Sequence, residues 1–314
     1  MTFRLVRFLH FSVNAVYSAD ERVKMSKKHP IISVIGSSGA GTSTVKHTFE
    51  QIFRREGINS VSIEGDAFHR FNRAEMKAEL DTRLEAGDET FSHFSYDANL
   101  LSELESVFRE YGETGEGKSR HYVHDDEESA RFGVQPGLFT EWEPFETGSD
   151  LLFYEGLHGA VVTDNLNIAS YADLKIGVVP VINLEWIQKI HRDKENRGYT
   201  TQAVTNVILR RMHAYVHCIC PQFTETDINF QRVPVVDTSN PFVARWIPTP
   251  DESIVVIRFK DPRGIDFSYL TSMIQGSWMS RANSIVIPGG KLDLAMQLIL
   301  TPMILRLVDH SRRS

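Results

Sequence analysis

The feature that most constrains this chain is a glycine-rich loop between an apolar run and an amphipathic run. Residues 30–35 read PIISVI, a short β-branched run typical of a buried strand, and residues 36–44 read GSSGAGTST. Apolar side chains then recur at helical spacing up to Gly57, a residue that commonly ends helices. This order of strand, loop and helix predicts a phosphate site, because loop N–H groups and the positive helix end point to one place.

The loop matches the phosphate-binding pattern G-x-x-x-x-G-K-[ST] at every position except the lysine. Thr42 occupies the lysine position, and Ser43 stands where a hydroxyl binds Mg2+. Phosphoryl transfer depends on cations near the transferring group, so another part of the chain must supply one. The alternative is a plain glycine turn without a ligand. We assign the ATP phosphates to Gly36, Ser37, Ser38, Gly39, Ala40, Gly41, Thr42, Ser43 and Thr44.

A candidate source of that cation is the segment EWIQKIHRDKENRG at residues 185–198. Lys189, Arg192, Asp193 and Arg197 fall at i, i+3, i+4 and i+8, which places them on one face of a helix. One interpretation is a solvated helix face with internal ion pairs. The other is a mobile lid that brings Lys189 and Arg192 onto the phosphates, with Asp193 as a further catalytic candidate.

The general base that we predict is Asp66, which ends the short strand pattern VSIEGD at residues 61–66. Residues 31–66 then form a β-α-β unit with parallel strands, so Asp66 emerges at the same sheet edge as the glycine loop, on the strand next to it. A carboxylate in this place can remove a hydroxyl proton. The alternative is an aspartate that caps a helix or turn. His69 and Arg73, which follow closely, fit a phosphate-binding role.

Glu155 ends a further strand pattern, LLFYE, and is the candidate metal residue together with Ser43. An acidic residue at such a strand end is typical of Mg2+ binding in phosphate-loop proteins. The alternative is an ordinary glutamate at a strand end.

The remaining patterns predict an α/β fold of the phosphate-loop kinase kind. Near-continuous apolar runs at 150–156 and 174–182 are typical of central strands of a mostly parallel sheet covered by helices on both faces. We expect helices near 72–84, 99–111, 184–197, 200–217 and 266–274 and from 291 onward. C-terminal strands at 253–259 and 284–287 extend the same sheet. Residues 25–314 are predicted to be one domain, with substrate loops between 67 and 149, and residues 1–24 are predicted to be a disordered upstream extension outside it.

Composition excludes some classes of protein. The 41 acidic residues exceed the 34 basic ones, giving a formal charge of −7, so no global field attracts nucleic acid or an acidic membrane. No apolar stretch beyond residue 25 is long enough to span a bilayer.

The two cysteines, Cys218 and Cys220, cannot form a disulfide framework, which favours a reducing, cytoplasmic location. With His213 and His217 they suggest zinc, but no second ligand pair completes the site, which favours a buried helix end.

The motifs together resemble one family. GSSGAGTST, IEGDAFHR, LLFYEGLHG, KIHRDKENRG and RVPVVDTSNPF are similar to the bacterial type of the phosphoribulokinase family, and the resemblance extends from Met25 to the C-terminus. Threonine at the lysine position is itself similar to that group. The resemblance implies transfer of the γ-phosphoryl of Mg-ATP to the C1 hydroxyl of D-ribulose 5-phosphate, giving ribulose 1,5-bisphosphate for the reductive pentose phosphate cycle.

The resemblance also implies roles for individual residues. Asp66 would remove the C1 hydroxyl proton and Glu155 would serve the metal. The sugar phosphate would be held by His69, Arg73 and Arg197, and the reacting phosphates would be met by Lys189, Arg192 and Asp193.

Regulation is implied in the same way. The bacterial type is an oligomer, commonly octameric, that is activated by NADH and inhibited by AMP. Arg211 and Arg258, basic residues outside the loop and lid, are the candidate effector residues. The plant type carries a regulatory cysteine in its phosphate loop, and this loop has none, so thioredoxin control is not expected.

Two alternatives remain open at this point. A related kinase acting on uridine or pantothenate shares the glycine loop, the strand-end aspartate and the lid pattern, and the substrate loops decide between them. A GTP-binding switch protein is a different class. It requires an N-K-x-D guanine signature, which the sequence lacks, and the D-x-x-G at Asp261 follows the wrong strand.

Overall fold

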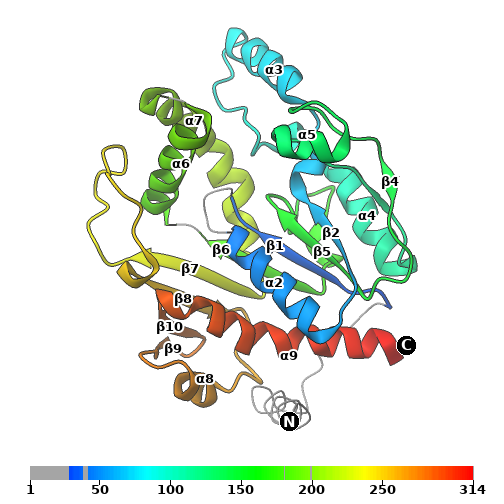
Figure 1. Ribbon diagram of the computed structural model, residues 1–314, viewed down its shortest axis with the longest axis vertical. Coiled ribbons are helices and arrows are strands. Elements are labelled where there is room, and N and C mark those ends of the chain that lie inside the picture. The colour runs from blue at the N-terminus through cyan, green and yellow to red at the C-terminus, as the bar shows by residue number, and fades with distance from the viewer. Residues whose placement is uncertain (1–27, 38–41, 180, 199, 314) are drawn as a thin grey trace.

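A computed structural model describes residues 28–37, 42–179, 181–198 and 200–313, without the side chains of residues 42–44, 196 and 197. Its centre is an eight-stranded sheet in the order β2-β5-β1-β6-β7-β8-β10-β9 (Figure 1). The parallel part consists of β1 (Ile31–Ile35), β2 (Ser60–Glu64), β5 (Leu151–Gly156), β6 (Leu174–Val179) and β7 (Ile228–Pro234). The antiparallel part consists of β8 (Ser253–Phe259), β9 (Trp278–Arg281) and β10 (Ser284–Pro288).

Helices cover both faces of this sheet because each central strand is apolar on both sides. Alternate residues of a strand point to opposite faces. Phe153 packs toward α2 (Thr42–Glu56) and α9 (Leu292–Arg313), whereas its neighbours Leu152 and Tyr154 pack toward α4 (Leu101–Thr114). Two separate apolar clusters result, one on each face of the sheet. Together they fix the position of the edge at which the parallel strands end.

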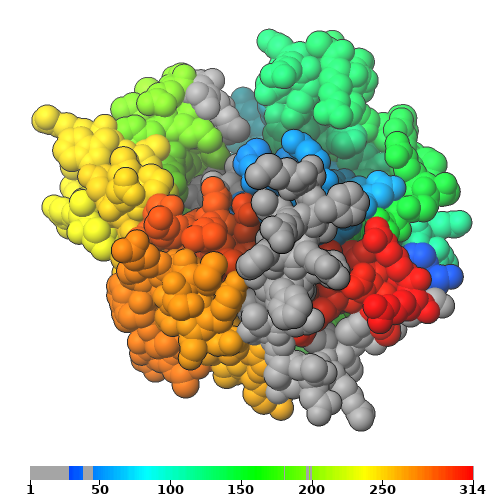
Figure 2. Space-filling view, turned by 60° about the horizontal axis from the view of Figure 1, so that its bottom comes forward, coloured from blue at the N-terminus to red at the C-terminus, as the bar shows by residue number. Residues whose placement is uncertain are grey.

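Two groups of helices stand beyond that edge. On one side are α6 (Ile182–Arg197) and α7 (Thr201–Ala214), and on the other are α3 (Arg73–Glu85) and α5 (Asp126–Phe132) with the small sheet of β3 (Lys118–Ser119) and β4 (Glu143–Pro144) (Figure 1). The remaining helix, α8 (Phe267–Met273), lies near β9. In Figure 2 the two groups form separate projections of the surface.

Most of the predicted elements are present where the patterns placed them. Helix α3 begins after Asn72, whose side chain accepts hydrogen bonds from the N–H groups of Ala74 and Glu75 and so caps the helix. The predicted C-terminal strands do extend the central sheet. Residues 1–24, predicted to lie outside the fold, fall outside the described residues. Within the described part of the chain, we find no helix that combines the length and the apolar character needed to cross a bilayer.

The order of the strands differs from the sequence prediction in one respect. We expected Asp66 on the strand next to the glycine loop, but β5 lies between β1 and β2. Pairing of β1 with β5 and of β5 with β2 is parallel throughout. The prediction was wrong because successive apolar strands do not reveal where a third strand is inserted.

The ends of β5 and β2 approach each other by backbone contact. A Cβ atom added at Gly156 would lie 2.7 Å from the Cα atom of Gly65 and 2.6 Å from the hydroxyl of Tyr154. A side chain at either glycine would therefore push the two strand ends apart. This contact fixes the position of the residue that follows Gly65, which is Asp66.

A segment after β7, residues 235–249, projects from the body and is yellow at the left of Figures 1 and 2. It packs along α6, because Asn183 Nδ2 donates to the carbonyl of Thr238 and the rings of Trp186 and Phe242 lie 5.2 Å apart. Its outer side carries exposed apolar groups, including Val243 and Trp246.

Candidate active site

The site lies where three parallel strands end. The N–H of Gly36, just after β1, donates to the carbonyl of Gly156, at the end of β5, over 3.2 Å. Glu155 is the residue before Gly156, and Asp66 follows β2 on the far side of β5. Carboxyl ends of parallel strands share one edge, which is where α/β proteins bind ligands. The phosphate loop, the predicted metal residue and the predicted base therefore meet at one edge.

The phosphate loop is described in part. Ser37 is buried, and its hydroxyl donates to the carboxylate of Glu185 on α6. Burial is the main reason that the pKa of Glu185 is raised. The predicted phosphate residues Ser38 to Gly41, and the side chains of Thr42, Ser43 and Thr44, lie outside the described residues.

Asp66 lies in a 3-10 turn, Gly65–Phe68, and its side chain is 41% exposed. One carboxylate oxygen is 3.1 Å from Nε2 of His69, and the other is 3.4 Å from Nε2 of His124. Desolvation by itself raises the pKa of Asp66, but positive charge on His69 and His124 outweighs it and lowers the pKa overall. The carboxylate is therefore ionised at neutral pH and accessible to a substrate.

The two predicted sugar-phosphate residues near Asp66 differ in their surroundings. His69 is 8% exposed, and its ring nitrogens face Asp66 and the amide oxygen of Asn99. Arg73 is exposed and donates from Nη2 to the carbonyl of His124. Arg73 thus has access to an anionic substrate, whereas His69 would have to give up one of its two partners. The third predicted residue, Arg197, has its side chain outside the described part.

The edge near Glu155 is rich in carboxylates. Glu155 on β5 is in register with Glu64 on β2, and Lys46 of α2 forms an ion pair with Glu64. Burial by itself lowers the pKa of Lys46, but Glu64 and Glu155 outweigh it and raise the pKa. Carboxylate oxygens are among the donors that Mg2+ prefers, so the predicted metal residue Glu155 has suitable chemistry for this ion, while the side chain of Ser43 lies outside the described residues.

The predicted lid residues meet on one face of α6. Lys189 Nζ lies 2.6 Å from one oxygen of Asp193, and Arg192 Nε lies 3.2 Å from the other. Lys189 is 8% exposed and Asp193 is 3% exposed, so this face is buried and is not the solvated face that the alternative required. Burial, and then the charge of Arg211, lowers the pKa of Lys189 to about 8. Gly198 ends α6 with φ of 66°, a conformation that glycine adopts readily.

Lys189 shares a pocket with Arg211 of α7. The guanidinium of Arg211 lies 5.2 Å from the ring centre of Phe94, and the pocket is lined by Phe94, Ile182, Glu185, Trp186, Lys189, Ile208, Arg211, Met212 and Tyr215. The sequence analysis placed Arg211 outside the predicted lid, but Arg211 lines the same pocket as Glu185 and Lys189 of α6. Arg258 lies apart on β8, where its exposed side chain donates to the carbonyl of Phe223 over 3.2 Å.

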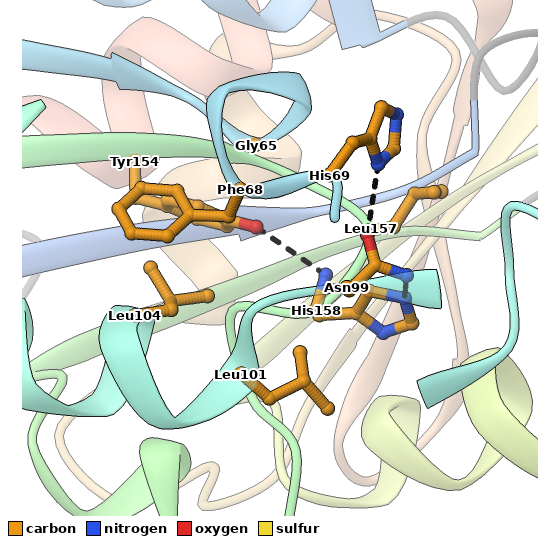
Figure 3. A pocket seen from close by; sticks show the side chains of 9 residues that line it. All are labelled: Gly65, Phe68, His69, Asn99, Leu101, Leu104, Tyr154, Leu157 and His158. Atoms are coloured by element: carbon orange, nitrogen blue, oxygen red, sulfur yellow. Dashed lines mark hydrogen bonds between the residues drawn. The ribbon is translucent and has the colours of Figure 1, made fainter. Parts of the chain in front are cut away.

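Behind the turn that carries Asp66 is a narrow buried pocket (Figure 3), lined by Gly65, Phe68, His69, Asn99, Leu101, Leu104, Tyr154, Leu157 and His158. His69, Asn99 and His158 lie in a row in it, joined by hydrogen-bond contacts. Sequence reasoning missed Asn99, His158, His124 and Glu185. Asn99 and His158 carry a weak signal, since each is a polar residue beside an apolar run. His124 lies in a polar stretch without periodicity.

The histidine and cysteine group after α7 has its own packing. The rings of His213 and His217 stack 4.2 Å apart, and His217 Nδ1 lies 2.8 Å from the carbonyl of His213. Cys218 and Cys220 pack against an apolar cluster that includes Tyr215. Among the residues that the structure describes, no group of three or more His, Cys, Asp or Glu side chains is arranged to hold a metal ion.

Comparisons with known proteins show to which family the chain is similar. Residues 31–239 match the model of the phosphoribulokinase / uridine kinase family. Over 288 residues the chain is 80% identical to phosphoribulokinase 1 of Cereibacter sphaeroides, covering 92% of this chain and 99% of that relative. It is 70% identical to a phosphoribulokinase of Nitrobacter vulgaris over 290 residues, 92% of this chain and 100% of the relative. A solved phosphoribulokinase from Rhodobacter spheroides is 76% identical, with a TM-score of 0.84 over 91% of this chain and all of that one.

Proposed function

The chain belongs to the phosphoribulokinase / uridine kinase family, and from this premise we propose that it is a phosphoribulokinase. It transfers the γ-phosphoryl of ATP to the C1 hydroxyl of D-ribulose 5-phosphate, giving ribulose 1,5-bisphosphate and ADP for the Calvin cycle. The observation that carries the proposal is the ionised, accessible Asp66 at the same sheet edge as the phosphate loop.

In this function each part of the site has a separate role. The loop after β1 holds the ATP phosphates through its N–H groups. Asp66 accepts the proton of the acceptor hydroxyl, so that the oxygen can attack the γ-phosphorus. Lys189 and Arg192 approach the transferring group when α6 closes and supply the charge that Thr42 cannot supply. His69, Arg73 and Arg197 bind the sugar phosphate, and His69 also contacts Asp66.

Glu155 and Ser43 would hold Mg2+ at the phosphate loop. Bound there, the ion offsets the negative charge of the phosphates.

The acceptor is tested by measuring ADP release with ribulose 5-phosphate, with uridine and with no acceptor. The guanidinium of Arg73, beside the His124 that faces Asp66, favours an acceptor that already carries a phosphate. We therefore expect ADP release that depends on ribulose 5-phosphate and stays at background with uridine. Release with uridine alone would assign the chain to the uridine branch of the family, and release without an acceptor would indicate a nucleotide hydrolase.

We further propose a cytoplasmic homo-oligomer of the bacterial type, an octamer, with NADH as activator and AMP as inhibitor. The exposed apolar groups of the segment 235–249, including Val243 and Trp246, support contacts between copies.

The candidate effector residue Arg258 is suited to a test because it lies apart from the lid pocket. We expect NADH to raise the activity and Arg258→Ala to weaken that response by about tenfold in NADH concentration, the effect of losing one charged contact. Basal activity should survive, because Arg258 contacts only the carbonyl of Phe223 among the contacts described for its guanidinium. Activation that is identical in both proteins would remove Arg258 from the effector site. Arg211 stays a predicted effector residue, but its substitution would also disturb the pocket of Lys189.

A further inference from the structure

The turn that carries the predicted base is held at its start by the strand ends. Gly65, its first residue, lies against Gly156, and Asp66 follows directly. The far end of the turn, from Ala67 to His69, needs contacts of its own, because a 3-10 turn of four residues has few and poorly aligned internal hydrogen bonds. The partners of its carbonyl oxygens show how this end is fixed, since carbonyls away from solvent require donors.

Three successive carbonyl oxygens at the end of the turn accept hydrogen bonds from other parts of the chain. That of Phe68 accepts from the N–H of Leu100 over 2.7 Å. Those of Ala67 and His69, on either side of Phe68, both accept from Arg120. Nε donates to the first over 2.9 Å, and Nη2 donates to the second over 2.8 Å. One side chain thus serves two of the three carbonyls.

The guanidinium of Arg120 is itself held by aromatic rings. Its central carbon lies 3.7 Å from the ring centre of Phe139 and 4.8 Å from that of Trp142. The ring of Trp142 also meets the ring of Phe68 edge-on, with 5.5 Å between the ring centres. A planar guanidinium on an aromatic face is stabilised by cation–π attraction and loses little further freedom when it donates hydrogen bonds. Arg120 therefore presents two donors to the turn in a fixed direction.

Arg120 belongs to an extended segment that brings three side chains to the base. Backbone hydrogen bonds pair residues 121–123 with residues 138–140. Alternate residues of an extended chain point to one face, and Arg120, Tyr122 and His124 all lie against the turn or the histidine that follows it. His124 faces the carboxylate, whereas Arg120 contacts main-chain oxygens. Arg120 therefore acts on the position of the turn, and His124 acts on the charge of the carboxylate.

We propose that Arg120 is a positioning residue for phosphoryl transfer, which holds the carbonyl oxygens of Ala67 and His69 and so fixes the carboxylate of Asp66 at the place of the acceptor hydroxyl. Arg120 does not contact the acceptor and takes no part in moving the proton. Its effect on rate arises because a base must lie within hydrogen-bond reach of the hydroxyl, and a small displacement of the turn removes that reach. The inference rests on the proposed function, because it takes Asp66 as the base.

The alternative is that Arg120 binds the anionic substrate directly, since arginine is well suited to phosphate. Two of its nitrogens already donate to the main chain, and Phe139 covers a face of the guanidinium. Arg120 would have to release the turn in order to bind a phosphate. The two roles differ in kinetics, because a lost phosphate contact raises KM for ribulose 5-phosphate, whereas a displaced base lowers kcat.

Two substitutions of Arg120 separate its shape from its charge. Arg120→Ala should lower kcat by about ten- to a hundredfold, the effect of losing two charge-assisted hydrogen bonds, and change KM for ribulose 5-phosphate by less than about threefold. Arg120→Lys keeps the charge but not the planar pair of donors, so kcat should stay at least about fivefold below wild type. Wild-type kcat in Arg120→Lys, or a larger change in KM than in kcat in Arg120→Ala, would overturn the proposal.

The double variant Asp66→Asn/Arg120→Ala tests whether Arg120 acts through the base. Without a proton acceptor on the turn, the exact position of the turn matters little. Arg120→Ala should therefore lower kcat by at most about a further threefold in Asp66→Asn protein, although it costs far more in wild type. Equal fold losses in the two backgrounds would show that Arg120 acts on something other than the base.

Arg131→Ala is the matched control. Arg131 is an exposed arginine of the same region, and its guanidinium lies 4.9 Å from the ring centre of Phe132. It has a cation–π contact like that of Arg120 but lies outside the contacts described for the turn of Asp66. Its loss should leave kcat within about twofold of wild type, as is usual for a surface substitution.

Hydrogen–deuterium exchange of the free proteins gives a measurement that needs no activity. In Arg120→Ala the amides of residues 66–70 should exchange about tenfold faster than in wild type, while those of β1 and β5 change much less and Arg131→Ala matches wild type. Unchanged exchange of residues 66–70, or equal acceleration of the turn and the central strands, would overturn the proposal. If the proposed function itself fails, wild type is inactive on ribulose 5-phosphate, and exchange still shows whether Arg120 holds the turn.

Discussion

Replacing Asp66 with Asn is expected to lower kcat by about two to four orders of magnitude, because the amide keeps the shape of the side chain but cannot accept a proton. The carboxylate is ionised, partly exposed and held by His69 and His124, and these are the properties that a base at this edge needs. The measurement is kcat with saturating ATP and ribulose 5-phosphate.

A thermal melt and a nucleotide-binding titration control the Asp66→Asn experiment. If Asp66 only caps its turn, the variant loses at most about 1 kcal/mol of stability and turnover stays nearly intact, since Asn caps almost as well as Asp. Turnover within about tenfold of wild type in a folded, nucleotide-binding variant would contradict the assignment of the base. Asp193 would then be the residue to test.

Lys189→Met is expected to lower kcat by about a hundred- to a thousandfold while ATP affinity changes much less. The reason is that charge which reaches the phosphoryl group only in the transition state contributes to kcat and not to ground-state binding. Lys189 is poised for this because it is buried on the lid face and held by Asp193. Single-turnover kinetics and an ATP titration measure the two effects separately.

Lys194→Met is the matched control for Lys189. Lys194 is an exposed lysine of the same helix, so its loss should leave kcat within about twofold of wild type, as is usual for an exposed surface substitution. Removing Lys189 also takes away one of the cations that contact the buried Asp193, which can destabilise the protein. A thermal melt must therefore show that the variant is folded. An unchanged kcat in folded Lys189→Met protein would rule out a catalytic role for this lysine.

The sequence predicts well those parts of the fold that depend on local periodicity. The run at 31–35, the glycine loop and the helix up to Gly57 are recognisable because strand, turn and helix each leave their own spacing of apolar residues. The same holds for α6, where the spacing of Lys189, Arg192 and Asp193 predicted that they share a face, and their contacts confirm it.

Other features depend on contacts between distant segments and leave little trace in the sequence. Strand β7 was not predicted because INFQRVP mixes polar and apolar residues, and β9 was not predicted because its four residues are exposed at a sheet edge. The insertion of β5 between β1 and β2 could not be predicted, because the strand patterns are similarly apolar and do not show which strands are neighbours. Asn99 reaches His69 across thirty residues, so this contact is visible only in the folded chain.

The close approach of Gly65 and Gly156 holds the turn of the predicted base at a fixed distance from the end of β5. Side chains sample several rotamers, and a spacing that depends on them fluctuates with those rotamers. The spacing between the Asp66 turn and the end of β5 is set by main-chain atoms of Gly65 and Gly156, which have no rotamers to exchange, and by the buried side chain of Tyr154. The entropy of placing the base near the phosphate loop is therefore lost once, when the chain folds, and is not lost again in each catalytic cycle.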